Sequence, residues 1–446
     1  MPRRPILTRA AGLSGIVNIW PRRPFHPMKP RNAILLAAWM LGSAGLTFNP
    51  GATMAAEPAA APRGTEPAKP AAPIAAAPAA LPPSQGPVAT AEVDAALGRA
   101  TTFLLTRQGP DGAWMQNPAV TGFDCWALAV APTRNTSEVQ AALRRGLDYI
   151  AARAQPDGSI YNPEQDEYPT YSTAICTIVL AQFNRPQDEK ILRAARAFLL
   201  KTQFTDAAND GVFYGGAGYG GGKSKRADLS NTQWALEAMY MTDRLDREPA
   251  SNDSEKARQS DLAWDRAIKF LEQCQNLKDV NKQTWVTDDP DSRGGFVYKP
   301  GESLPGEKGG GSHNTYGSMT YAGLKSLIYA KLTKDDPRVK AATEWVARHY
   351  TFEENPGMKD SGLYYYFHTA AKTLAVLGQE ELTLPDGSKR RWREDLTRAV
   401  LARQNADGSW SNRNNRFWEG VPELSTSFSA MCLGVTLDRQ PQAPQP

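Results

Sequence analysis

Two kinds of helical segment alternate along the chain from about residue 92 onward. The first kind has a single apolar face. In the segment 142–154, Leu143, Leu147 and Ile150 recur at helical spacing, whereas Arg144 lies on the opposite face. A helix with one apolar stripe packs that stripe against a core and exposes the rest to water. Segments of this kind are therefore predicted to be outer helices.

The second kind of segment is apolar on most sides and follows a segment of the first kind. Helices that are apolar all round are buried, so these segments are predicted to be inner helices. They lie at 124–130, 173–183, 232–241, 319–331, 369–377 and 427–437. Most have a residue near the start that can cap a helix, namely Thr121 or Asp124, Ser172, Ser230, Ser318 and Ser425.

A short phrase recurs between the outer and the inner segments. It consists of Gln, a polar turn with Asp-Gly and an aromatic residue, and it reads RQGPDGAW at 107–114, AQPDGSIY at 154–161 and RQNADGSW at 403–410. Longer or degenerate versions lie at 198–214, 270–298 and 345–365. Glycine permits the tight turn, the Gln amide donates to one helix end and accepts from the next, and the aromatic ring supplies packing surface. The phrase therefore predicts structural joints between neighbouring helical hairpins.

These units predict an all-α fold, an (α/α)6 toroid of six helical hairpins. Single hairpins of this kind cannot bury a core, whereas hairpins set side by side can. An open superhelix is the competing arrangement. The last inner segment carries Phe428, Met431, Leu433 and Val435 and is as apolar as the middle ones. Because the terminal units lack a polar cap, closure of the ring is favoured.

The Gln-x-x-x-Gly-x-Trp phrases between paired helices resemble the repeat of the terpene cyclases (squalene–hopene and oxidosqualene cyclases) and of protein prenyltransferase β subunits. The resemblance covers about residues 92–438, nearly the whole predicted folded part. It implies an α/α toroid with an aromatic, apolar central cavity. In such a cavity, ring faces hold an isoprenoid chain and stabilise carbocations.

The usual catalytic motifs of these families are missing. The frame that best matches D-x-D-D-T-A of squalene–hopene cyclases, at 169–174, reads PTYSTA and has no acid. His368 lies in YYFHT, which resembles the Y-H-T of the prenyltransferase zinc site, but the segment 314–321 that should carry D-x-C reads NTYGSMTY. No metal and no cofactor are therefore expected.

Candidate site residues gather at the predicted starts of the inner helices, which would form one rim of the ring. The candidate catalytic residues are Asp124, His313, His368 and Tyr365, and the candidate substrate-binding residues are Tyr171, Asp228, Tyr316, Tyr321 and Tyr366. Each has a structural alternative: Asp124 as a helix cap, the histidines as buried structural groups and the tyrosines as core aromatics.

The first 91 residues are predicted to lie outside the folded domain. The apolar run 33–46 follows Lys29 and Arg31 and has the length of a signal-peptide core, so 1–56 is interpreted as a leader, with Met28 as an alternative start. An uncleaved membrane anchor is the alternative. Residues 57–91 contain 13 Ala and 9 Pro and are predicted to be a disordered linker, as is the tail 439–446. The folded domain is predicted at 92–438, exported to the periplasm or secreted.

Charge excludes one class of partner. The chain has 51 Lys and Arg against 47 Asp and Glu, but seven of the basic residues lie in 1–56 with no acidic residue, which leaves 44 against 47 and a net charge of −3. A chain near neutrality has no electrostatic basis for binding nucleic acid. A monomer is expected, with at most peripheral membrane association. Four cysteines in 446 residues are too few for a disulfide scaffold.

Three functional hypotheses follow. The first is a protein whose cavity binds an apolar, isoprenoid-like ligand, either as a binder or as a divergent terpene-cyclase-like enzyme. The second is a polysaccharide lyase or glycosidase, which predicts an open cleft with paired carboxylates drawn from Asp124, Asp228, Asp360 and Glu423. The third is a non-catalytic scaffold. The expected ligand is a small molecule, lipid-like under the first hypothesis and a saccharide under the second.

Overall fold

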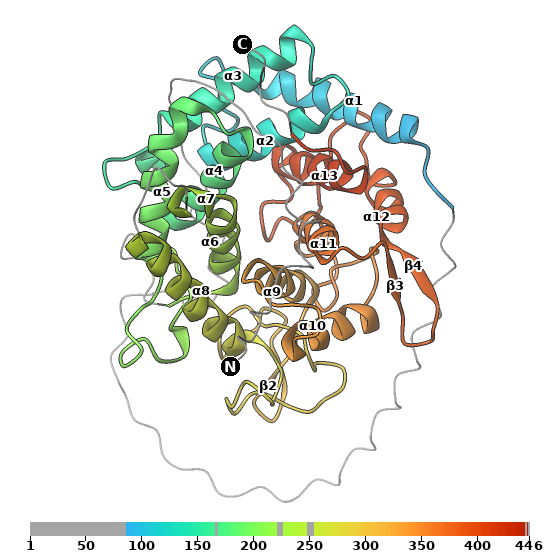
Figure 1. The fold of residues 1–446 in the computed structure, drawn as a ribbon. Helices are drawn as coiled ribbons and strands as arrows, with labels where there is room; N and C mark the ends of the chain where they lie inside the picture. Colours follow the sequence, from blue (N-terminus) through green and yellow to red (C-terminus); the bar gives the residue numbers. More distant parts are fainter. Residues whose placement is uncertain (1–85, 166–167, 221–225, 248–253, 442–443, 445–446) are drawn as a thin grey trace, which may run out of the picture.

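The computed structural model describes residues 86–165, 168–220, 226–247, 254–441 and 444. The predicted leader 1–56 and most of the linker 57–91 lie outside these residues. The described residues are mostly helical, which confirms the predicted class (Figure 1). Within them, no helix is long and apolar enough to cross a membrane.

The inner helices form a closed ring. In chain order they are α2 (Pro118–Val130), α4 (Pro169–Phe183), α6 (Leu229–Met241), α9 (Gly317–Tyr329), α11 (Leu363–Leu377) and α13 (Pro422–Thr436). Each packs against the next, and α13 packs against α2. Every residue of α2 is buried, as the apolar sequence of this kind of segment predicts.

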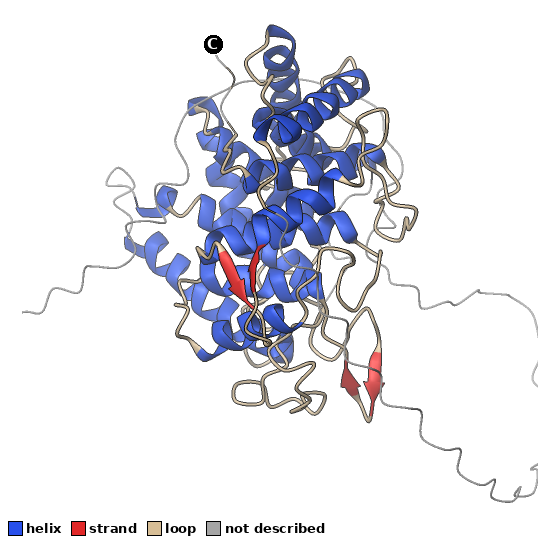
Figure 2. Ribbon diagram, turned by 90° about the vertical axis from the view of Figure 1, so that its right-hand side faces the viewer, coloured by secondary structure: helices blue, strands red, loops and turns tan. Residues whose placement is uncertain are grey.

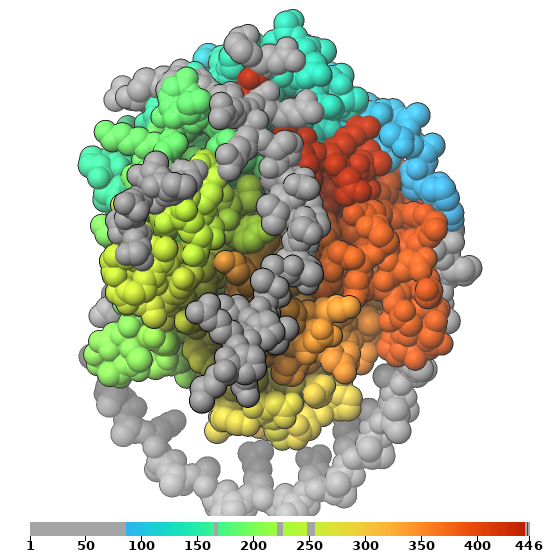
Figure 3. Space-filling model, in the orientation of Figure 1, coloured from blue at the N-terminus to red at the C-terminus, as the bar shows by residue number. Residues whose placement is uncertain are grey.

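The outer helices pack around this ring (Figure 1). They are α1 (Thr90–Arg107), α3 (Ser137–Ala151), α5 (Glu189–Thr202), α8 (Ser254–Cys274), α10 (Pro337–Arg348) and α12 (Trp392–Leu401), with the short α7 (Arg244–Arg247) before α8. In the space-filling view, the N-terminal residues of α1 lie beside the C-terminal helices (Figure 3), and α1 contacts both α12 and α13. The two ends of the described chain therefore meet.

The remaining regular structure consists of short pieces. There are two antiparallel strand pairs among the described residues, β1 (Glu307–Gly309) with β2 (Ser312–His313), and β3 (Glu381–Thr383) with β4 (Lys389–Arg391). In Figure 2 one pair lies in front of the helices and the other projects beyond them. Short 3-10 turns occupy Pro163–Gln165, Pro186–Asp188 and Gly211–Phe213.

Gln side chains join neighbouring outer helices. The Gln108 amide nitrogen, just after α1, donates at 2.9 Å to the carbonyl of Gly112 in its own turn and at 2.9 Å to the carbonyl of Ala142 in α3. Gly112 has φ +87°, and a Cβ there would lie 2.5 Å from the Arg145 carbonyl oxygen, so the turn requires glycine. The same pair of bonds recurs with Gln203 to Gly215 and Ala263, Gln275 to Gly294 and Arg338, and Gln404 to Gly408 and Ala96.

The inner helices begin earlier than the sequence analysis predicted. Asn117 caps α2 by accepting from the Val120 nitrogen at 2.9 Å, so neither Thr121 nor Asp124 is the cap. The prediction missed that proline is favoured at the first helical position, as at Pro118, because its fixed φ suits a helix and it has no N–H to leave unpaired. α4 and α13 begin with proline in the same way, and α6 begins after Asp228 rather than at Ser230.

The ends of the folded domain also differ from the prediction. Helix α1 begins at Thr90, two residues before the predicted boundary. The predicted disordered tail is ordered in its first residues: the Arg439 guanidinium bonds the Asp94 carboxylate, and the Pro441 carbonyl accepts from the Gln182 amide at 3.4 Å. The ion pair and the bond to the buried Gln182 hold this segment, which composition alone does not reveal.

Candidate functional site

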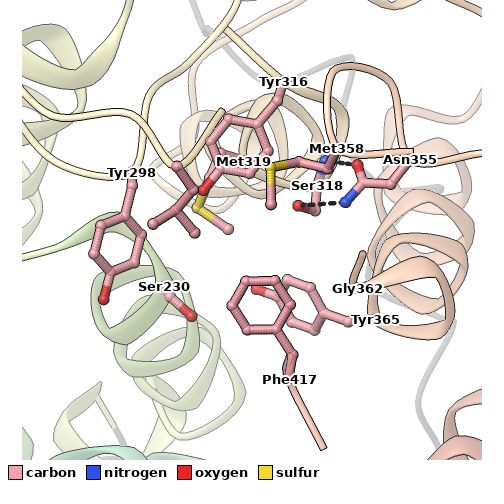
Figure 4. Close-up of a pocket in the computed structure, with 11 residues that line it drawn as sticks. Ser230, Tyr298, Tyr316, Ser318, Met319, Asn355, Met358, Gly362, Tyr365 and Phe417 are labelled. Atoms are coloured by element: carbon pink, nitrogen blue, oxygen red, sulfur yellow. Dashed lines mark hydrogen bonds between the residues drawn. The ribbon is translucent and has the colours of Figure 1, made fainter. Parts of the chain in front are cut away.

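A pocket of about 600 Å³, including its open mouth, lies at the N-terminal ends of α6, α9 and α11. Helix residues Ser230, Ser318, Met319 and Tyr365 form one part of its lining (Figure 4). The connecting segments supply Tyr298, Leu304, Tyr316, Asn355, Met358 and Phe417. The lining is therefore mostly aromatic and aliphatic, and none of these residues is a carboxylate.

Most polar groups of this lining already have protein partners. The hydroxyls of Tyr298 and Tyr219 are 2.8 Å apart. The Asn355 amide donates to the Ser318 hydroxyl at 3.3 Å and accepts from the Ser318 backbone nitrogen at 3.0 Å (Figure 4). The Tyr365 hydroxyl accepts from the Gln233 amide at 3.4 Å. These bonds hold the lining in place and leave the pocket apolar in character.

Tyr316 differs from the other polar residues of the lining. It precedes α9 in an extended backbone conformation, and its side chain is 1% exposed. Within the described part of the chain its hydroxyl has no hydrogen-bond partner. Burial raises the pKa of this hydroxyl well above its ordinary value, so it keeps its proton.

Glu419 fixes the start of α11 and with it Tyr365. Gly362 precedes the helix in the left-handed conformation, with φ +69°. Because glycine has no side chain, it cannot cap the helix. Instead the buried Glu419 carboxylate accepts from the Tyr365 backbone nitrogen at 2.8 Å and from the Asn412 amide at 2.8 Å. Burial raises the pKa of Glu419 to about 7, against the lowering effect of these donors.

About one turn further along the inner helices from their N-terminal ends, an aromatic cluster fills the interior of the ring. The aromatic cluster comprises Phe123 of α2, Trp234 of α6, Tyr365 and His368 of α11, and Phe428 of α13. The His368 ring stacks on Trp234 at 5.9 Å and on Phe428 at 5.5 Å between ring centres. Helices that are not neighbours in the ring therefore meet across it.

His368 is neutral in this setting. Its side chain is 1% exposed, and neither ring nitrogen has a hydrogen-bond partner among the described residues. Burial, reinforced by the ammonium groups of Lys372 and Lys325, lowers the pKa of the imidazole well below its ordinary value. His368 is not among the residues that line the pocket, and it follows the lining residue Tyr365 by about one turn of α11.

A buried charge cluster lies in the ring below these aromatic residues. The Glu237 carboxylate of α6 binds the ammonium groups of Lys325 of α9 and Lys372 of α11, and all three side chains are at most 4% exposed. The lysines also lie over the faces of Trp234 at 5.1 Å and Trp126 at 4.6 Å. The aromatic faces that would attract a ligand cation thus hold ammonium groups of the chain itself.

The pKa values of the charge cluster reflect opposing effects. Burial alone would raise the pKa of Glu237, but the two ammonium groups outweigh burial and lower it to about 2. Burial lowers the pKa of Lys325 to about 8, against the attraction of Glu237. The carboxylate therefore stays ionised across the physiological range.

Two other candidate residues from the sequence lie close to the pocket. The Tyr171 hydroxyl accepts from the indole nitrogen of Trp234 at 3.1 Å. Asp228 caps α6 by accepting from the Asn231 backbone nitrogen at 2.8 Å, and burial raises its pKa to about 7. Both hold helix α6, and neither lines the pocket.

The remaining candidates lie elsewhere. The Ser427 hydroxyl of α13 donates to the Asp124 carboxylate of α2, and burial raises the pKa of Asp124 well above its ordinary value. The Tyr321 and Tyr366 rings pack on each other at 5.6 Å, and the Tyr366 hydroxyl donates to the Thr351 carbonyl. His313 lies in β2, with its ring 5.7 Å from that of Trp285.

The carboxylates named for a carbohydrate enzyme do not form a pair in the pocket. Asp124 and Asp228 are occupied by the contacts just described. The Asp360 carboxylate accepts from the Asn414 amide at 3.0 Å, and Glu423 lies 3.7 Å from the Arg107 guanidinium. Across the described ranges, no group of three or more His, Cys, Asp or Glu side chains is arranged to hold a metal ion.

Sequence reasoning missed the charge cluster and most of the pocket lining, of which only Tyr316 and Tyr365 were candidate site residues. Glu237, Lys325 and Lys372 are charged residues inside segments that are otherwise apolar. Because charged side chains are rarely buried unless they are paired, these three residues together indicated a buried ion pair. Met319 and Phe417 carried no such signal, because an apolar residue that lines a pocket looks like one that fills a core.

No protein-family model and no curated protein sequence matches this chain. Solved structures with helical toroid folds resemble it. A variant of the type II terpene cyclase MstE from Scytonema, bound to geranylgeranyl dihydroxybenzoate, is 12% identical over 77% of this chain and 97% of that chain, with TM-score 0.46. A D-mannose isomerase is 13% identical over 78% and 97%, with TM-score 0.48. The GH76A α-1,6-mannanase from Salegentibacter sp. HEL1_6 is 14% identical over 77% and 98%, with TM-score 0.44. At these values the resemblance carries no functional information.

Proposed function

We propose that this protein binds an apolar, isoprenoid-like small molecule in the pocket at the N-terminal ends of α6, α9 and α11. The observation that supports this proposal is the lining itself, in which Met319, Met358, Leu304 and Phe417 lie among tyrosine rings without a carboxylate. Apolar surface transferred from water to such a lining contributes roughly 25 cal/mol per Å². Ligand pockets of proteins are typically built in this way.

The position of the ligand differs from that implied by the family resemblance. The centre of the ring is occupied by the aromatic cluster and by Glu237, Lys325 and Lys372. The proposed ligand therefore binds above these groups, at the rim. An acid-initiated cyclisation would need a proton donor over the bound chain, whereas Asp124 bonds Ser427 and lies outside the lining. The residues thus favour binding over cyclisation.

We propose that the architecture is an (α/α)6 toroid of six helical hairpins whose joints are the Gln-containing turns. The closed packing of the inner helices and the repeated Gln hydrogen bonds support this assignment. We also propose that the protein is an exported monomer. Support for export comes from the leader pattern at 1–56 alone, and sequencing the N-terminus of the mature protein tests it.

Mass spectrometry of molecules extracted from the purified, natively produced protein tests the proposed ligand class. We expect an apolar isoprenoid-type compound. A calorimetric titration of the protein with the isoprenoid ketone geranylacetone provides a second measurement, in which we expect saturable binding. Recovery of an oligosaccharide, or failure of both measurements to detect an apolar ligand, would contradict the proposal.

A further inference from the structure

The hydroxyl of Tyr316 is the buried polar group of the pocket lining that lacks a partner in the described structure. The other polar side chains of the lining are engaged: Tyr298 with Tyr219, Ser318 with Asn355, and Tyr365 with Gln233. The Ser230 hydroxyl interacts with the hydroxyls of Tyr171 and Tyr365. An unpaired buried hydroxyl lowers the stability of the fold, because it loses its hydrogen bonds with water and gains none in the protein.

The geometry directs this hydroxyl at the ligand space. In Figure 4 the Tyr316 ring enters from above the pocket, and its oxygen points toward the space enclosed by Met319, Ser230 and Tyr365. Tyr316 is only 1% exposed, so bulk water does not serve as its regular partner. A group bound in the pocket is therefore the natural partner of this hydroxyl.

We propose that the ligand of this pocket is an oxygenated apolar molecule, and that Tyr316 selects it by donating a hydrogen bond to its carbonyl, ether or hydroxyl oxygen. This inference rests on the proposed function and adds to it the chemical class of the ligand. Tyr316 is then the residue that distinguishes an oxygen-bearing isoprenoid from a plain hydrocarbon of the same shape.

The hydroxyl acts as a donor rather than as an anion. Burial favours the protonated form of Tyr316, as do Tyr365 and Asp228, and these effects outweigh the opposing positive charge of Arg416. Tyr316 therefore presents a proton to the ligand throughout the physiological pH range, and the matching ligand group is an acceptor. A site built to bond an oxygen rejects the analogue that lacks it, because the site's own polar group is then left unpaired.

A pair of isosteric probes tests the inference. The first probe is geranylacetone, and the second is the triene in which a =CH2 group replaces its carbonyl oxygen. Their dissociation constants are measured by calorimetric titration on the full-length protein and on Tyr316→Phe. We expect the wild-type protein to prefer the ketone by about 5- to 150-fold. In Tyr316→Phe this preference disappears, because ketone affinity falls while triene affinity is kept.

Tyr321→Phe is the matched control. Tyr321 is a buried tyrosine of α9 whose ring packs on Tyr366 and lies outside the pocket lining. We expect this variant to keep the wild-type preference for the ketone. If Tyr316→Phe does not fold, the infrared carbonyl band of geranylacetone bound to the wild-type protein replaces it, and a shift to lower frequency than in hydrocarbon solvent supports the hydrogen bond.

The outcomes separate the two proposals. If the wild-type protein binds ketone and triene equally, or if Tyr316→Phe keeps the preference, the role of Tyr316 is refuted while the apolar pocket stands. An unshifted carbonyl band has the same meaning. If neither probe binds to the wild-type protein, the proposed function itself fails.

Discussion

The side-chain amide of Gln404 donates at 2.9 Å to the backbone carbonyl of Ala96, which lies 308 residues earlier in the chain. Ala96 belongs to the first outer helix, α1, and Gln404 lies just after the last, α12. The same amide bonds the Gly408 carbonyl in its own turn at 2.9 Å. A bond that elsewhere joins consecutive outer helices here joins the last outer helix to the first, and so closes the ring.

Replacement of Gln404 by alanine tests this closure. The variant loses these two hydrogen bonds and also the one that the Arg99 guanidinium of α1 donates to the Gln404 side-chain oxygen at 3.1 Å. The contact between the chain ends is weakened, so we expect the free energy of unfolding to fall by about 1 to 3 kcal/mol. Urea denaturation measures the change. Gln155→Ala is the control, because among the described residues the Gln155 amide bonds only its own turn, at the carbonyls of Arg153 and Tyr161. An equal loss in the two variants would mean that closure adds nothing beyond a local turn.

The buried charge cluster makes Glu237 sensitive to substitution. Glu237→Gln leaves the ammonium groups of Lys325 and Lys372 in the ring interior without a counter-charge. Removing one partner of a buried ion pair typically costs about 3 to 5 kcal/mol, and we expect a loss of that size at pH 7. Denaturant unfolding measures it.

A triple variant separates charge from packing at the same site. Replacing both lysines by methionine in the Glu237→Gln background removes the unpaired charges, and we expect most of the lost stability to return.

The pH dependence of the stability that arises from Lys325 has a defined sign. The folded-state pKa of Lys325, about 8, lies below its ordinary 10.5, so the unfolded chain binds more protons between these values and stability rises with pH there. Stability of Glu237→Gln that does not change between pH 7 and pH 10 would contradict this account.

The raised pKa of Glu419 gives the free energy of unfolding a pH dependence of the opposite sign. Its folded-state pKa is about 7 against an ordinary 4.5, so the folded chain binds more protons between these values. The free energy of unfolding therefore falls as pH rises from 4.5 to 7, by about 3 kcal/mol from this residue, since each pKa unit corresponds to ~1.4 kcal/mol. We expect Glu419→Gln to lose that part of the slope in denaturation curves taken across this range. An unchanged slope in Glu419→Gln would contradict this account.

Phe417 contributes apolar area to the pocket. Its ring is partly buried and contacts the start of α11, where a Cβ on Gly362 would lie 3.2 Å from it. We expect Phe417→Ala to weaken the binding of geranylacetone about 10- to 150-fold, because it removes roughly 1.5 to 3 kcal/mol of apolar contact. Calorimetric titration measures the affinity. Phe213→Ala, at a partly buried phenylalanine that is not among the lining residues, should bind with wild-type affinity, and unchanged binding by both variants would exclude Phe417 from the site.

The sequence alone determined the helical class and the approximate places of the helices. Two patterns carried this information, the single apolar stripe of segments such as 142–154 and the all-round apolar character of the inner segments. Both are local, because side chains three and four residues apart share a face of a helix whatever the rest of the chain does. Helix starts were less well predicted, since capping choices such as Asn117 depend on one or two residues.

Only the tertiary structure decided which of the candidate residues share a site. Tyr316 and Tyr365 line one pocket, although 48 positions in the sequence separate them, while Tyr321 and Tyr366 pack on each other outside it. One residue along a helix turns a side chain by about a quarter of a turn, so neighbours in the sequence face different surroundings. The sequence therefore fixed the kinds of groups near the rim, and packing selected those that meet a ligand, because burial and contact depend on the elements that surround a residue rather than on its neighbours in the chain.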